Sequence, residues 1–355
     1  MEFNDTRKVI IIGNGFDLAH GLKTRYYDFL IWYLNDSLQK ALNNHDLMYK
    51  DDLLSLNVDN RRLDVFISEL NDLQNFKWLS LNITSKFFKH IYTLANKRWV
   101  DIEYELFAFI KDNAVAINDN QVTRLKSIEK NIKNINVEFE LLKNKLIEYL
   151  KTIRISSPND SLMSVFKNHV LLRDVTHYED CKGIIINFNY TETLSSYRLW
   201  LVDGLNNYKI INIHGEIENQ INNPIIFGYG DEMDPIYAEM ERLNNNDLIK
   251  NFKSFSYLRT KNYGELVRFL NFNADYEVFV LGHSCGISDR VLLSNVFDRK
   301  NCKKINLFYY DMGDKKNDFI EKVQEVSRHF KPESKNEMRE KIRPFSESVS
   351  LNNIL

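Results

Sequence analysis

A run of four consecutive β-branched residues, Val9-Ile10-Ile11-Ile12, leads directly into the turn Gly13-Asn14-Gly15-Phe16-Asp17. Such a run is typical of a strand buried on both faces, as in a parallel sheet. The two glycines end the strand, and Asp17 stands where a helix N-cap is expected. Together these features gather backbone N–H groups at one point, which suits a phosphate. The third glycine of a dinucleotide motif is replaced by Leu18, so a purely structural turn is an equal alternative.

The composition describes an ordinary globular chain and excludes several classes. Its 355 residues are 44% hydrophobic and 27% charged, enough for one large domain or two. The net charge of −2 lacks the basic excess typical of duplex nucleic-acid binders, so nucleic acid is not an expected partner. We expect no membrane partner either, since the N-terminus lacks a signal-peptide pattern and no apolar run approaches the roughly 20 residues that span a bilayer.

Cysteine and histidine spacing bear on redox compartment and metals. The three cysteines (Cys181, Cys285, Cys302) are odd in number and lack C-x-x-C spacing, which argues against a disulfide framework or a zinc ribbon. The eight histidines show no H-E-x-x-H or H-x-x-E-H spacing. We therefore expect a cytoplasmic protein without a bound metal.

Residues 31–175 are predicted to form a helical insertion. Apolar residues from Leu125 to Ile153 recur at spacings of three and four, which predicts one long amphipathic helix. It packs either in an intramolecular bundle or in a coiled-coil homodimer. The run Trp99–Glu103 is interpreted as a helix start with Trp99 in the core; the alternative is that Asp101 or Glu103 faces a functional site.

The rest of the chain has the pattern of an α/β domain. Short β-rich runs alternate with helical or loop sequence after residue 183: 183–188, 208–213, 224–227 (a short one), 277–281 and 304–310. With the first strand they predict a Rossmann-like parallel sheet of five or six strands, built from residues 1–30 and 176–330. Residues 331–355, rich in Lys, Glu, Ser and Asn, are predicted to be a loosely held C-terminal tail.

Polar residues follow four of the predicted strands. Besides the opening turn, they are Asn189 and Thr191 after the second strand, His214 after the third, and Gly282, His283, Ser284 and Asp289 after the fifth. Any one of them could be a turn or a helix cap, as Thr191 and Asp289 illustrate. Because ligands bind beyond the carboxyl ends of parallel strands, the four together predict a polar cleft.

Two other patterns compete for a functional role. The sequence Gly282-His283-Ser284-Cys285-Gly286 fits the G-x-S-x-G nucleophile elbow, and Ser284, Asp311 and His329 form the one triad in hydrolase order. That hypothesis leaves Asn189, His214 and the opening turn without a purpose. The basic and aromatic stretch 257–263 is interpreted as an exposed loop or lid, with a nucleic-acid contact as the alternative.

The motifs GNGFDLAHGLKTRYYDF, FNYTETL, IHGEI and GHSCGISD, in this order, resemble those of AbiH-type bacteriophage abortive-infection proteins. A more distant similarity connects the opening turn and Gly21-Leu22 with the G-A-G-I-S-x-x-x-G-I motif of sirtuins. Asn189-Tyr190 and His214-Gly215 resemble the sirtuin N-Y and H-G pairs. This resemblance implies an NAD-binding, sirtuin-like fold with Asn189 and His214 beside the nicotinamide ribose, and Gly282 and Ser284 in a nucleotide loop.

Two departures limit the comparison with sirtuins. Asp17 replaces a serine near the phosphates, where a carboxylate repels them, and the cysteines of the sirtuin zinc module are absent. A protein deacetylase is therefore not expected.

The resulting hypothesis is antiphage defence through an NAD glycohydrolase. Cleaving the nicotinamide–ribose bond passes through an oxocarbenium-like state. The Gly13–Asp17 turn would hold the pyrophosphate, Asn189 would place water or a ribose hydroxyl, and His214 would act as the base. The alternative is a non-catalytic nucleotide-binding sensor that answers a phage-derived trigger through a partner.

Overall fold

The computed structural model describes residues 6–59, 70–78, 80–95, 101–118, 122–155, 157–171, 183–201, 208–272 and 274–352. At its centre lies a five-stranded, all-parallel sheet with the strand order β6-β5-β1-β7-β8. Its strands are β1 (Arg7–Ile12), β5 (Gly183–Asn187), β6 (Tyr208–Asn212), β7 (Tyr276–Leu281) and β8 (Cys302–Leu307). In chain order this is 3-2-1-4-5, the order of a Rossmann-like doubly wound sheet, which confirms the predicted fold class.

The β-branched run of β1 is the middle of this sheet. Val9 lies opposite Ile184 of β5 and Val278 of β7. Because side chains alternate along a strand, Val9 and Ile11 enter one apolar core, while Ile10 and Ile12 enter another on the opposite face. Both faces are therefore covered, as the continuous apolar run predicts.

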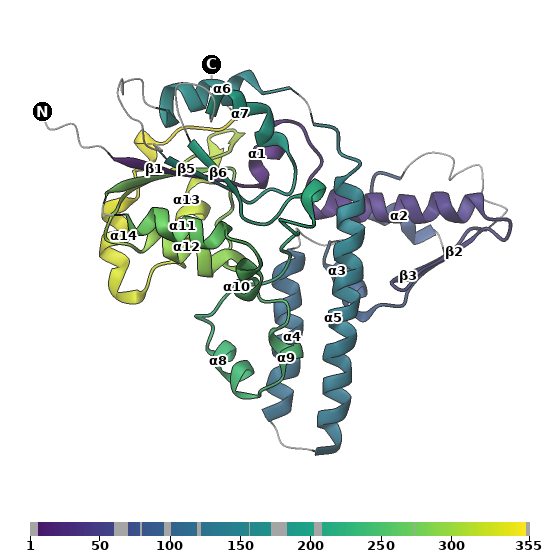
Figure 1. The fold of residues 1–355 in the computed structure, drawn as a ribbon. Coiled ribbons are helices and arrows are strands. Elements are labelled where there is room, and N and C mark those ends of the chain that lie inside the picture. The colour runs from purple at the N-terminus through teal and green to yellow at the C-terminus, as the bar shows by residue number, and fades with distance from the viewer. Residues whose placement is uncertain are drawn as a thin grey trace, which may run out of the picture.

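Helices from different parts of the chain cover the two faces (Figure 1). The core around Val9 and Ile11 contains side chains of α11 (Asn262–Asn271), α12 (Arg290–Phe297), α13 (Phe319–Ser327) and α14 (Lys335–Lys341). The core around Ile10 and Ile12 contains side chains of α1 (Asn14–Ala19), α6 (Asp160–Val165) and the single π-helical turn Phe166–Val170.

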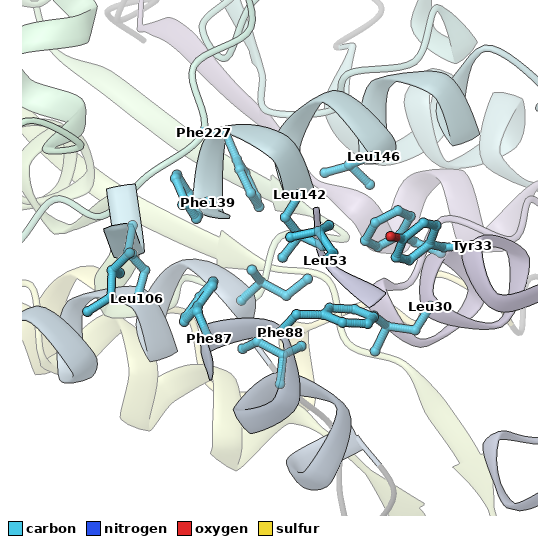
Figure 2. Packing of buried hydrophobic residues seen from close by; sticks show 14 of the residues in the cluster. Leu30, Tyr33, Leu53, Phe87, Phe88, Leu106, Phe139, Leu142, Leu146 and Phe227 are labelled. Atoms are coloured by element: carbon cyan, nitrogen blue, oxygen red, sulfur yellow. The ribbon is translucent and has the colours of Figure 1, made fainter. Parts of the chain in front are cut away.

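The helical part extends away from the sheet, with the long helices α4 and α5 side by side (Figure 1). Its helices are α2 (Tyr26–Asn43), α3 (Lys86–Ala95), α4 (Ile102–Asn118) and α5 (Val122–Leu150). Figure 2 shows their shared core, where Phe87 and Phe88 of α3 face Phe139 and Leu142 of α5. The long helix predicted from the spacing is thus confirmed as α5, and its apolar stripe is buried within the chain.

Two expectations about strands are wrong. The insertion is not purely helical, because β2 (Met48–Lys50), β3 (Leu54–Asn57) and β4 (Ser80–Ile83) form an antiparallel sheet. The run Pro224–Phe227 is not a strand of the main sheet. Its side chains are divided between two cores: Ile225 and Phe227 pack on the helical part, with Phe227 stacked on Phe139 at 4.9 Å, and Ile226 packs toward the sheet.

The C-terminal segment is also held more firmly than predicted. Met338 of α14 and Leu351 are buried against the two faces of the sheet domain. Isolated parallel bridges join Ile342 to Ile305 and Ser350 to Tyr309. A few apolar side chains thus anchor a segment whose overall composition is polar. The prediction for Trp99 lies outside the described residues.

The remaining elements are short. They are α7 (Arg198–Leu201), α8 (Pro235–Arg242), α9 (Asn246–Ile249), α10 (Lys253–Ser256), β9 (Asp311–Gly313) and β10 (Lys316–Asn317). Side chains of 225–252 belong to the core of the helical part, so this segment connects that part to the sheet.

Candidate functional site

A cavity of about 440 Å³ opens at the carboxyl edge of the sheet, where the segments after β1, β5, β6 and β7 meet. This size lies within the range of small-molecule sites, roughly 300–1,000 Å³. The predicted residues that line it are Asn14, Gly15, Asp17, Asn189, Thr191, His214, Gly282, His283, Ser284 and Asp289. The helical part supplies another wall, with Tyr26, Asp101, Glu103, Leu146 and Leu150. The cavity therefore lies between the two parts of the chain.

The glycines of the opening turn have a packing role. A Cβ at Gly13 would lie 2.5 Å from the Cα of His283, and one at Gly15 would lie 2.8 Å from the Cα of Gly282. Gly15 N–H donates to the Gly282 carbonyl at 2.7 Å. The loops after β1 and β7 thus meet backbone to backbone at the point where the strand order reverses, which supports the structural interpretation of G-x-G. Phe16 points away from the cavity into the core beneath the sheet.

Asn189 lies beside this turn. Its side-chain Nδ2 donates to the Gly13 carbonyl at 3.2 Å, and its backbone N–H donates to Asn187 Oδ1 at 3.2 Å. These bonds fix a buried carboxamide at the cavity wall. Gly13 therefore takes part through its carbonyl rather than as a lining residue.

Asp17 is a buried carboxylate on the same wall. Thr191 Oγ1 donates to Asp17 Oδ2 at 2.6 Å and lies 3.0 Å from Thr193 Oγ1. Burial raises the pKa of Asp17, although the hydroxyls of Thr191 and Thr193 partly offset this. Thr191, expected as a ligand contact or a turn residue, also serves to hold Asp17.

His214 lines the cavity, and aromatic side chains surround its ring. Its Nε2 is 3.1 Å from Asp289 Oδ1 and 3.3 Å from the hydroxyl of Tyr257. Its ring lies nearly parallel to Tyr190 and edge-on to Phe188. Burial and then the charge of Lys253 lower the pKa of His214, so the ring is neutral near pH 7. Within the stretch expected to be an exposed loop, Tyr257 is the exception, since its side chain is buried and in contact with His214, whereas Leu258, Arg259 and Lys261 are exposed.

Lys253 is a residue of the candidate site that sequence reasoning missed. Its side chain is 1% exposed, and its Nζ donates to Asp289 Oδ1 at 2.7 Å and to Glu103 Oε2 at 3.1 Å. Glu103 Oε1 also accepts the backbone N–H of Gly228 at 2.8 Å. No local motif marks this lysine, so no sequence signal could have found it. Both interpretations of the run that ends at Glu103 hold. A helix starts here, since α4 begins at Ile102 and Asp101 Oδ1 accepts the backbone N–H of Glu103 at 3.0 Å, and Asp101 and Glu103 also line the cavity.

Around Lys253 the pKa values of Asp289 and Glu103 are shifted in opposite directions. Burial opposes ionisation of Asp289, but Lys253 and His214 outweigh it and hold the pKa of Asp289 well below its ordinary value. Burial raises the pKa of Glu103, and Lys253 only partly offsets this. Burial alone would lower the pKa of Lys253, but the two carboxyl groups hold it above its ordinary value. The site therefore keeps an ionised Asp289 beside a neutral histidine.

His283 and Ser284 lie where the loop after β7 meets the cavity. His283 Nδ1 accepts the backbone N–H of Cys285 at 2.9 Å, and its Nε2 lies 3.6 Å from Asp289 Oδ2. Burial lowers the pKa of His283 to about 3, so it stays neutral. Ser284 is exposed at the cavity.

The structure does not assemble the hydrolase triad. His329 is buried, and its Nε2 is bonded to the Cys285 carbonyl at 2.8 Å. The non-glycine residue with positive φ in the loop after β7 is Cys285 (φ 57°) rather than Ser284, which differs from a strained nucleophile turn. Cys285 itself is buried, and burial raises the pKa of its thiol to about 12. Asp311 accepts the Gly313 backbone N–H in β9.

The sequence of this chain matches a known protein family over most of its length. The sequence profile of the bacteriophage abortive infection AbiH family matches residues 9–311, from β1 to just beyond β8. The chain belongs to the AbiH family. This membership supports an antiphage abortive-infection role. The match contains every residue of the cavity named in the prediction, and no curated protein gives a match.

Among the described residues, no group of three or more His, Cys, Asp or Glu side chains is placed to hold a metal ion. In the same part of the chain, none of the helices combines the length and apolar character needed to cross a bilayer.

Proposed function

We propose that this AbiH protein is an NAD glycohydrolase that breaks the bond between nicotinamide and ribose in the cavity. The observation that carries the proposal is the convergence of Asn189, His214 and Asp289 on one partly enclosed site at the carboxyl edge of a Rossmann-like sheet. Ligands bind at this edge in such sheets.

The electrostatics of the site suit the chemistry. As the C–N bond breaks, its electron pair passes to the nicotinamide nitrogen and positive charge develops on the ribose. The ionised Asp289 supplies negative charge at the cavity, whereas burial raises the pKa of Asp101 and of Glu103 on the facing wall and favours their neutral forms. Fixed negative charge in a partly enclosed site favours such a transition state.

Water then completes the reaction. In this proposal Asn189 orients the attacking water or a ribose hydroxyl, and the oxygen of water bonds to the anomeric carbon. The hydrogen-bonded pair of His214 and Asp289 accepts the proton that the water loses. The described lining residues include two cationic side chains: Lys322 is paired with Asp318, and Arg25 would meet the phosphates.

The experiment follows free nicotinamide by chromatography after NAD is added to the purified protein. We expect release by the wild type and a fall of about 10²–10⁴-fold in Asn189→Ala and in His214→Ala. Exposed residues of the helical part provide matched controls, Asn43→Ala and His45→Ala, which should keep the wild-type rate. Circular dichroism confirms folding of each variant. An unchanged rate in both site variants would remove these residues from the mechanism.

A second candidate function is a non-catalytic nucleotide sensor. The observation that favours it is the shared wall: a ligand in the cavity contacts Tyr26 and Glu103 of the helical part as well as the sheet. Binding could therefore change how the two parts sit together and signal to a partner. Tight binding of NAD with no nicotinamide release, with and without phage lysate as a source of a trigger, would establish the sensor.

A further inference from the structure

One oxygen of Asp17 has no partner. The side chain is 1% exposed and lines the cavity, and Thr191 occupies Oδ2. Within the described part of the chain, no hydrogen bond reaches Oδ1, although Thr193 and Asn189 lie near the carboxyl group. A buried carboxylate oxygen that lacks a donor is costly, so one that faces a cavity indicates where a ligand supplies the donor.

The surroundings decide which kind of donor fits. Five of the described lining residues are carboxylic acids (Asp17, Asp101, Glu103, Asp289 and Asp318), whereas Arg25 and Lys322 are the lining cations in that set. Lys322 Nζ is already paired with Asp318 at 3.2 Å. A phosphate beside Asp17 would meet like charge, and burial already raises the pKa of this carboxyl group.

Neighbouring groups narrow the choice to a sugar. Asn189 lies on the same wall, and in the proposed function this residue lies beside the ribose. The carboxamide and the carboxyl group together offer a donor and an acceptor, the pattern that a sugar hydroxyl can satisfy in both directions.

We propose that Asp17 is a specificity-determining residue whose free Oδ1 accepts a hydrogen bond from a hydroxyl of the ligand's ribosyl group, with the phosphates held elsewhere. This rests on the proposed function for the identity of the ligand. It reverses the expectation that the opening turn holds the pyrophosphate, and it gives a positive role to the residue that departs from the sirtuin pattern.

The test is a binding cycle measured by titration calorimetry. The probe is carba-NAD, in which a methylene replaces the ring oxygen of the nicotinamide ribose, so that the bond is not cleaved. Analogues of carba-NAD that lack one or the other hydroxyl of that ring complete the set. Each ligand is titrated into the wild type, Asp17→Ala and Asp17→Asn. The asparagine variant keeps the side-chain volume and an oxygen for Thr191, so the cycle remains readable if Asp17→Ala fails to fold.

The cycle separates a ligand contact from a structural role. In the wild type, removing the contacting hydroxyl should weaken binding about 10- to 100-fold, as for hydrogen bonds to charged groups. In the Asp17 variants the same deletion should change affinity less than threefold, because the partner oxygen is gone or altered. Binding of intact carba-NAD should itself weaken in Asp17→Ala.

Other outcomes overturn the proposal in distinguishable ways. Tighter binding of carba-NAD by Asp17→Ala would show that the carboxylate faces a phosphate. Equal losses from hydroxyl deletion in the wild type and both variants would show that Asp17 touches no hydroxyl, while nicotinamide release by the wild type would leave the proposed function intact. Absence of both carba-NAD binding and nicotinamide release in the wild type would refute the proposed function and this inference together.

Discussion

Replacing Lys253 by methionine tests whether one buried cation holds the site together. Methionine matches the length of the lysine stem but carries no charge. The variant leaves Glu103 and Asp289 facing each other in a buried site that now lacks the ammonium group donating to both. Removing one partner of a buried ion pair costs about 3–5 kcal/mol, because the remaining charge is uncompensated.

This cost converts into a measurable shift of the melting temperature. With an unfolding entropy of about 2.1 cal/mol/K per residue, a chain of 355 residues loses roughly 4–7 °C. The assay is thermal and guanidinium unfolding followed by circular dichroism. Lys111→Met is the matched control, since the Lys111–Asp234 pair has a similar distance, 2.9 Å, but its lysine is 40% exposed. We expect that variant to lose less than about 1 kcal/mol.

The loss should also depend on pH with a defined sign. Without Lys253, the pKa of Glu103 rises further above its ordinary value, so the folded state binds a proton more tightly than the unfolded chain does. In the wild type the pKa of Glu103 is already raised to about 8, so below that pH this group is protonated in both folded proteins and contributes equally to their stability. The extra penalty of the variant appears as pH rises above about 8, toward its own higher folded pKa. The difference between Lys253→Met and wild type should therefore be larger at pH 9 than at pH 7. A loss no greater than that of Lys111→Met, or one independent of pH, would refute this account of the site.

Two further predictions concern backbone packing and acid stability. Gly282→Ala should destabilise the protein by about 2 kcal/mol or more, because φ is +71° and a Cβ would lie 2.3 Å from the Phe16 nitrogen. Gly264→Ala in α11 is the control: a Cβ there would have nothing within 4 Å, so this variant should be more stable by about 0.5 kcal/mol. Equal effects of the two substitutions in denaturant unfolding would contradict this prediction. Burial lowers the pKa of His283 to about 3 and of His329 to about 4, so the unfolded state binds more protons below pH 6.5. The free energy of unfolding therefore decreases as the pH is lowered. We expect the two histidines to remove roughly 2–3 kcal/mol between pH 7 and pH 5.5, and a flat stability profile over that range would show that they titrate in the fold as they do in the unfolded chain.

Much of the fold was predictable because the apolar patterns that define it are local. The continuous β-branched run of β1 and the 3-4 spacing of α5 each indicate, from neighbouring residues alone, which side chains are buried. The strands β2 to β4 escaped prediction because they are three or four residues long and partly exposed. Pro224–Phe227 has the composition of a strand, but the two cores on either side of it determine its conformation.

The site was predictable only where polar residues follow strands directly. Asn189, His214 and Asp289 come together because parallel strands end at one edge. Tyr257 begins a stretch whose basic and aromatic composition suggested exposure, and Lys253 precedes that stretch with no motif around it. Only the folded chain places the two side chains beside His214 and Asp289. Glu103 depends on the helical part packing against this edge, which no spacing in the sequence encodes.

A crystal structure of the protein with carba-NAD tests the central claim most directly. The account predicts the ring that replaces the nicotinamide ribose inside the cavity, beside Asn189 and His214, with the phosphates toward Arg25. Density for the ring outside the cavity, or for the adenosine end in its place, would contradict the proposed reaction.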